Sequence, residues 1–179
     1  MSSVTITPLH TISPARVEVI WETSSQNLCC TIEYPEKVRV DQESTALRDF
    51  LDAKWPLPRP RRMIVGGEFS MVLDSEGRLH DFDIRTDLTQ RFLQPIAQGD
   101  AGYMEPYIQA AFDDGGDAEC SPIEEALYDP AQGIVCLSWG GADRWCNIAP
   151  TLALGLAADG KLMKIQLSEF WPRVPNARS

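Results

Sequence analysis

The side chains that could support catalysis are few and widely spaced in this sequence. The two histidines, His10 and His80, form neither an i, i+4 pair nor a His-Glu-x-x-His helix, so a zinc site of the usual kind is not expected. Asp81 and Asp83 flank an apolar residue on a predicted strand and should point to one side, as acid–base catalysis or cation binding would need. A solvated strand face explains this spacing more simply. A nucleophile built from His80 and a cysteine is an alternative that the sequence does not favour.

Phosphate-binding and metal-binding motifs are also missing. The pairs Gly66-Gly67 and Gly140-Gly141 lack the further glycines and the lysine of phosphate and dinucleotide loops. The acidic stretch 113–119 lacks the Asp-x-Asp-x-Asp-Gly register and the distal glutamate of a calcium loop. We therefore predict no catalytic, cofactor-binding or metal-binding residues, and we favour a protein that is not an enzyme.

Two stretches have compositions that suit contact with a partner. One is the Gly-containing loop from Trp139 to Trp145, because Trp and Arg are enriched in binding hot spots. The alternative is that both tryptophans turn inward and cap a sheet. The other is the acidic stretch, which we expect to be a solvated linker. The candidate partner-binding residues are Trp139, Asp143, Arg144, Trp145, Asp113, Asp114, Asp117 and Glu119.

The net charge of −10 limits the classes of partner. A negative field repels nucleic acids and anionic membranes and attracts basic proteins, although simple solubility would also explain it. No apolar run approaches the roughly 18–20 residues that cross a bilayer, and the N-terminus lacks a signal core, so we expect a cytoplasmic protein. The five cysteines have no metal-type spacing and, being odd in number, argue against a closed disulfide framework.

Two segments with the same pattern must position these residues. In 69–84 and in 152–167, alternating apolar residues flank a turn that contains glycine, which is a strong hairpin signal. Shifted by 83 positions, the segments align without a gap, with Phe69 on Leu152, Gly77 on Gly160 and Ile84 on Leu167. The alignment predicts an internal duplication.

The remaining elements follow from periodicity and from Pro and Gly. Strands are predicted at 17–21, 28–34, 37–41 and 134–139, a helix at 44–55, two helices within 88–112 and a stiff basic connector at 56–62. The predicted fold class is α+β, with two related antiparallel β-meander halves and a few helices. The predicted parts are a first half at 1–86 with the inserted helix, a helical and acidic connector at 87–122 and a second half at 123–179.

The second half resembles the DUF2283-type β-meander, a family of unknown function. The likeness is carried by Tyr128-Asp129-Pro130, an apolar strand ending near Ser138, and the second hairpin with its turn Asp159-Gly160-Lys161. It covers about 40 residues there and the hairpin of the first half. The resemblance implies a compact sheet with a helix, and it implies no activity.

Three functions remain open. The favoured one is a non-enzymatic acidic protein that binds a basic protein, as an immunity protein, inhibitor or regulatory module would. The second is a small-molecule-binding protein or enzyme that uses a cleft between the two halves. The third is a structural subunit that forms a homodimer through an exposed sheet edge.

Overall fold

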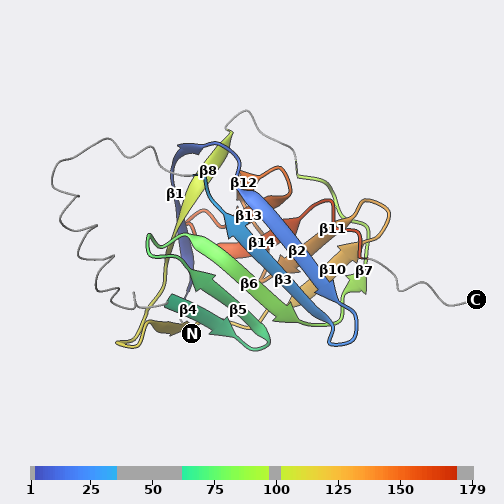
Figure 1. Cartoon of the computed structure of the whole chain (residues 1–179), viewed down its shortest axis with the longest axis horizontal. Helices are drawn as coiled ribbons and strands as arrows, with labels where there is room; N and C mark the ends of the chain where they lie inside the picture. The colour runs from blue at the N-terminus through green and yellow to red at the C-terminus, as the bar shows by residue number, and fades with distance from the viewer. Residues whose placement is uncertain (1–2, 36–61, 97–101, 173–179) are drawn as a thin grey trace, which may run out of the picture.

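The described part of the chain contains strands and no helix. The computed structural model describes residues 3–35, 62–96 and 102–172, which form strands β1 to β14 (Figure 1). The prediction of an α+β protein is therefore wrong for these residues, which are all-β. The predicted helix at 44–55 and the predicted strand at 37–41 lie outside the described residues.

The two six-stranded sheets have five strands in the same order. In the first, the order is β2 (Arg16–Glu22), β3 (Asn27–Glu33), β6 (Leu79–Arg85), β5 (Phe69–Leu73), β4 (Arg62–Gly66) and β9 (Asp117–Glu119). In the second, it is β10 (Glu125–Asp129), β11 (Ile134–Ser138), β14 (Leu162–Leu167), β13 (Leu152–Leu156) and β12 (Arg144–Ala149), with β7 (Thr89–Gln90) beside β10. The strands β2 to β6 thus have the same arrangement as β10 to β14. The short strands β9 and β7 are added in parallel to β4 and β10.

The two predicted hairpins are confirmed, and they match in detail. They are β5–β6 and β13–β14, both antiparallel. Each has an irregularity in pairing at the same aligned place, between Val72 and Leu73 in one and between Gly155 and Leu156 in the other. The turn glycines Gly77 and Gly160 have φ values of 80° and 87°, which only glycine adopts without steric cost.

A separate two-stranded ribbon connects to both hairpins. It pairs β1 (Thr5–Ile12) with β8 (Tyr103–Gln109), and Ile6 lies opposite Ile108. The backbone N–H of Ile6 donates to the carbonyl of Gly160, and that of Ile108 donates to the carbonyl of Gly77, both at 2.8 Å. The two ribbon strands therefore play matching roles toward the two hairpins: β1 binds the second hairpin and β8 binds the first.

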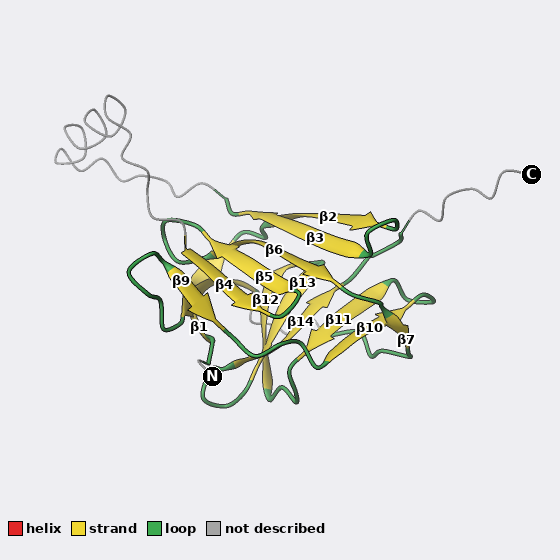
Figure 2. Ribbon diagram, turned by 90° about the horizontal axis from the view of Figure 1, so that it is seen from below, coloured by secondary structure: helices red, strands yellow, loops and turns green. Residues whose placement is uncertain are grey.

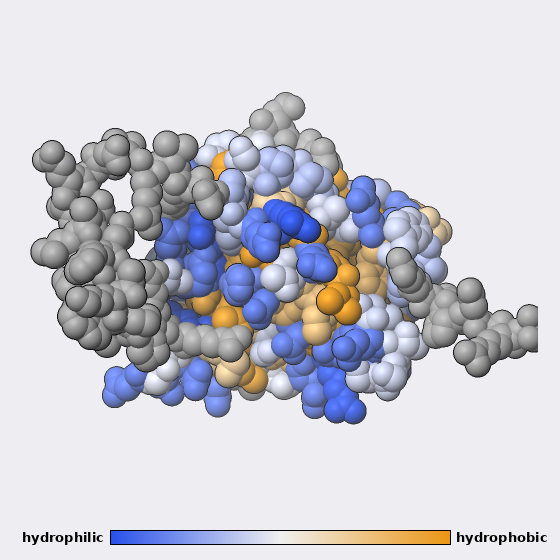
Figure 3. Space-filling view, viewed as in Figure 1, coloured by the Kyte–Doolittle hydropathy of each residue, from blue (hydrophilic) through white to orange (hydrophobic). Residues whose placement is uncertain are grey.

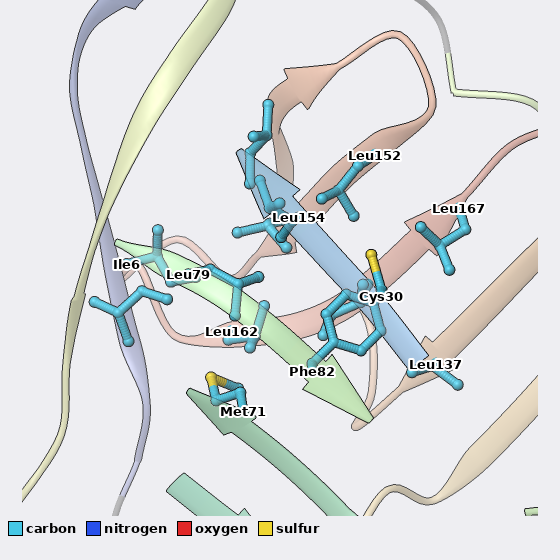
Figure 4. Packing of buried hydrophobic residues seen from close by; sticks show 14 of the residues in the cluster. Ile6, Cys30, Met71, Leu79, Phe82, Leu137, Leu152, Leu154, Leu162 and Leu167 are labelled. Carbon is cyan, nitrogen blue, oxygen red and sulfur yellow. The ribbon is translucent and has the colours of Figure 1, made fainter. Parts of the chain in front are cut away.

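The core lies between the two sheets. Figure 2 shows the sheets as two stacked layers, and Figure 4 shows side chains such as Phe82 of β6 and Leu137 of β11 in the space between them. Alternation along each strand directs one set of side chains inward. On β3, for example, Leu28, Cys30 and Ile32 are buried, whereas Cys29 on the opposite face is half-buried, as expected for neighbours on a strand. The buried residues form one cluster that includes strands from both sheets.

The predicted helices within 88–112 are wrong because their backbone groups bond elsewhere. The N–H groups of Arg91 and Leu93 donate to the carbonyl of Tyr128 and to the carboxylate of Asp129, and this holds the segment extended beside β10. Further along, Pro106 lies inside the strand β8, and proline lacks the N–H that a helix interior needs.

Candidate functional site

The outward face of the first sheet gathers many of the carboxylates in the described chain. Cross-strand pairing places Ile20, Cys29, Asp83, Ser70, Val65 and Glu119 in one row across the six strands. A neighbouring row contains Glu18, Thr31, Asp81, Val72, Met63 and Asp117. With Glu22 and Glu33 at its β2–β3 side, we call this surface the acidic face.

The strands that build the core also position these acids. Because residues alternate between the two sides of a strand, burying Phe82 and Ile84 of β6 directs Asp81 and Asp83 outward. The predicted common orientation of these two carboxylates is therefore confirmed. The short strand β9 then brings Asp117 and Glu119 onto the same side, although they lie more than thirty positions further along the chain.

The acidic face mixes its negative charge with apolar side chains. In the described strands, its outward basic residues are Arg16 and Arg85, and Arg16 lies 4.0 Å from Glu33. Ile20 is 53% exposed, and the Met63, Val65 and Val72 side chains lie between the two acidic pairs. Figure 3 looks onto this side of the molecule and shows hydrophilic residues with hydrophobic ones among them.

The pKa of Cys29 reflects the negative potential of the acidic face. Burial raises the pKa of its thiol first, and the nearby carboxylates of Asp83, Glu22 and Asp81 raise it further. A hydrogen bond from Asn27, whose Nδ2 lies 3.0 Å from the sulfur, acts in the opposite direction. Negative charge disfavours the thiolate, and a positively charged group at the same place would be stabilised.

In the predicted contact loop from Trp139 to Trp145, one tryptophan packs against interior residues and the other lies at the surface. Trp139 is half-buried; its Nε1 donates to the carbonyl of Ser121 at 2.7 Å, and its ring meets Phe69 edge-on with centroids 5.1 Å apart. Trp145 is 38% exposed, while Asp143 accepts a hydrogen bond from the N–H of Ala158. The stretch is also not a loop throughout, because β12 begins at Arg144.

The acidic stretch 113–119 is a turn followed by a strand. One carboxylate oxygen of Asp113 accepts the N–H groups of Gly115 and Asp117, both at 2.9 Å, so Asp113 shapes the turn. Asp114 is exposed in that turn. Asp117 and Glu119 point outward on β9, and they are the two members of this stretch in the rows of the acidic face.

A small pocket lies where the two sheets meet. Its volume is about 110 Å³, and we call it the junction pocket. The residues that line it come from the N-terminal segment before β1, from both sheets and their turns, and from the connector between β9 and β10. They include Ser3, Met71, Cys120, Glu124, Trp139, Lys161 and Leu162. Polar and apolar side chains contribute about equally to this wall. Burial raises the pKa of the Cys120 thiol, which favours its neutral form.

Near the turn of the first hairpin lies an ionic cluster that sequence reasoning missed. The Arg78 guanidinium lies 2.7 Å from Asp74, 3.0 Å from Glu76 and 3.8 Å from Glu105, and it stacks over the ring of Tyr34 at 4.5 Å. His10 adds a contact of 2.8 Å to Glu105, which is 2% exposed. The sequence pattern predicts a helix around Glu105, which would not bring this carboxylate to Arg78. In the structure Glu105 lies on β8.

The described residues offer little support for nucleophilic or metal chemistry. All five cysteines are free thiols, and burial raises the pKa of Cys30 to about 12 and of Cys146 to about 11. Among the described residues, His80 forms no hydrogen bond with a cysteine. In the same part of the chain, no group of three or more His, Cys, Asp or Glu side chains could hold a metal ion.

No protein-family model and no curated protein matches the chain. The similarity to the DUF2283-type meander therefore stays a prediction. Across the described residues, no helix is long and apolar enough to cross a membrane.

Proposed function

We propose that this protein is a non-enzymatic binding protein whose acidic face contacts a basic protein partner. The observation that supports the proposal is the alignment of Asp81 and Asp83 with Asp117 and Glu119 across one sheet. The exposed Ile20 and the half-buried Met63 and Val65 lie on the same face. Apolar contacts supply affinity at a protein interface, whereas complementary charge supplies specificity and a fast association rate. An inhibitor, an immunity protein or a regulatory module would use such a surface.

Neutralising the acidic face tests this proposal. The variant carries Asp81→Asn, Asp83→Asn, Asp117→Asn and Glu119→Gln, which keep side-chain size and the hydrogen bond that Asp83 accepts from Ser70. The matched control removes four exposed carboxylates elsewhere through Asp87→Asn, Glu125→Gln, Asp159→Asn and Glu169→Gln. Both variants change the net charge equally, so a difference between them locates the contact.

The measurement is native mass spectrometry of the tagged protein, gently purified from its host at low salt. We expect the wild type and the control to retain a stoichiometric basic protein, and the acidic-face variant to lose it. Added salt should weaken the wild-type complex, because charges at an exposed surface are screened beyond about 8 Å at 0.15 M. Retention of the partner by the acidic-face variant, or equal loss from both variants, would overturn the proposal.

A further inference from the structure

The junction pocket occupies the place in the second hairpin that the ionic cluster occupies in the first. The hairpin alignment puts Lys161 on Arg78, and the matching backbone bonds agree: Asp74 N–H donates to Arg78, and Ala157 N–H donates to Lys161, both at 2.9 Å. The ribbon supports the same correspondence, since Ile6 and Ile108 are paired and bind equivalent glycines. Ser3 lies three residues before Ile6, and Glu105 lies three residues before Ile108, so Ser3 corresponds to Glu105.

The two cations have different surroundings. Arg78 lies near the carboxylates of Asp74, Glu76 and Glu105. Around Lys161, Ala157 stands at the place of Asp74 and Ser3 stands at the place of Glu105. Asp159 corresponds to Glu76, but its carboxylate accepts the backbone N–H of Lys161 at 3.1 Å. None of the salt bridges between described residues includes Lys161.

We propose that the junction pocket binds a small monocarboxylate with an apolar body, and that Lys161 holds its carboxylate. The ligand carboxylate takes the position that the protein's own acids take beside Arg78. The apolar body rests against Trp139 and Leu162, with the fully buried Met71 behind them, and the hydrogen bond from Trp139 to Ser121 fixes the plane of the indole. In Figure 4, Met71 and Leu162 lie in the same part of the core, which is where this wall is formed.

Volume and charge limit the ligand further. A cavity of about 150 Å³ holds benzene, so 110 Å³ accommodates a smaller body of about four or five carbon atoms. Glu124 also lines the pocket and repels a second negative charge. The site therefore selects short branched or linear monocarboxylates over dicarboxylates and over bulky aromatic acids.

Titration of the full-length protein with 4-methylpentanoate tests the proposal. We expect saturable shifts of the Trp139 indole N–H and the Met71 methyl signals in NMR spectra, with a Kd of roughly 0.1–1 mM for a ligand of this size. The neutral 4-methylpentanamide has the same shape, and it should bind at least about tenfold more weakly because it lacks the charge-assisted contact.

Variants separate the role of Lys161 from general surface charge. Lys161→Met keeps the apolar stem and should weaken 4-methylpentanoate binding about tenfold, whereas Lys161→Arg should retain it. Lys164→Met removes a lysine of β14 that does not line the pocket, and it should leave the Kd unchanged. Absence of saturable shifts, equal binding of the amide, or an unchanged Kd in Lys161→Met would each overturn the proposal.

Discussion

Cys29 offers a direct way to read the charge of the acidic face. Cys29 lies in the same cross-strand row as Asp83, and its exposure is intermediate. Thiol modification requires the reagent to enter the local field, so a cationic reagent should be concentrated there and an anionic one excluded. The background is favourable, because Cys30, Cys136 and Cys146 are buried and only Cys120 shares the intermediate exposure.

We predict that a trimethylammonium methanethiosulfonate modifies Cys29 roughly tenfold faster than the sulfonate of similar size, at low ionic strength in a Cys120→Ala background. The additional changes Asp81→Asn and Asp83→Asn should reduce this ratio and lower the pKa of Cys29, because both carboxylates raise it. Intact mass spectrometry over time measures both rates.

Loss of labelling in Cys29→Ser identifies the modified thiol in that experiment. Equal rates for the two reagents, or a ratio that Asp81→Asn and Asp83→Asn leave unchanged, would show that the outward carboxylates do not create the expected field.

At the level of elements, local signals in the sequence predicted the hairpins well. Alternating apolar residues around a glycine turn were enough to place 69–84 and 152–167, because a hairpin depends on residues that are close in sequence. The two predicted helices within 88–112 failed because long-range partners, including Asp129, decide that conformation. The warning sign was Pro106, which a helix interior does not accommodate.

The candidate site was likewise predictable only where it depends on residues that are close in sequence. That Asp81 and Asp83 share a face followed from their spacing on one strand. Their alignment with Asp117 and Glu119 did not, because β9 has three residues and its partner β4 lies about fifty positions away. The equivalence of Lys161 with Arg78 could be found from the hairpin alignment, but the difference in their surroundings requires the positions of β1 and β8.

The turn glycines test how the hairpins meet the ribbon. A Cβ on Gly77 would lie 2.7 Å from the Tyr107 ring, and one on Gly160 would lie 3.2 Å from the carbonyl oxygen of Ile6. Both residues also have positive φ. We predict that Gly77→Ala lowers the free energy of unfolding by roughly 2–3 kcal/mol and Gly160→Ala by roughly 1–2 kcal/mol, measured by urea unfolding.

Gly141→Ala is the control for these two substitutions, since nothing lies within 4 Å of its added Cβ. It should change stability by less than about 0.5 kcal/mol. Wild-type stability of Gly77→Ala would mean that the hairpin turn does not pack against β8 in the way described.

On the scale of the whole molecule, the two sheets depend on each other. They share one buried cluster, and each takes its sixth strand from the segment between the two halves. The ribbon strands β1 and β8 also bind opposite hairpins. Separating the two sheets would therefore expose the inward face of both and break hydrogen bonds at both hairpin turns.

This mutual dependence predicts a single cooperative unfolding transition. Leu28 is buried in the first sheet and Leu137 in the second, so replacing either with alanine should cost roughly 2–5 kcal/mol. Native-state hydrogen exchange resolved by residue should show that each substitution lowers the protection of slow amides in both sheets by the same free energy. The contrary result would be that Leu28→Ala lowers the protection of amides in β2 to β6 only, while amides in β10 to β14 keep wild-type protection. The sheets would then be independent units. A shared core would not explain how the acidic face and the junction pocket are held in one molecule.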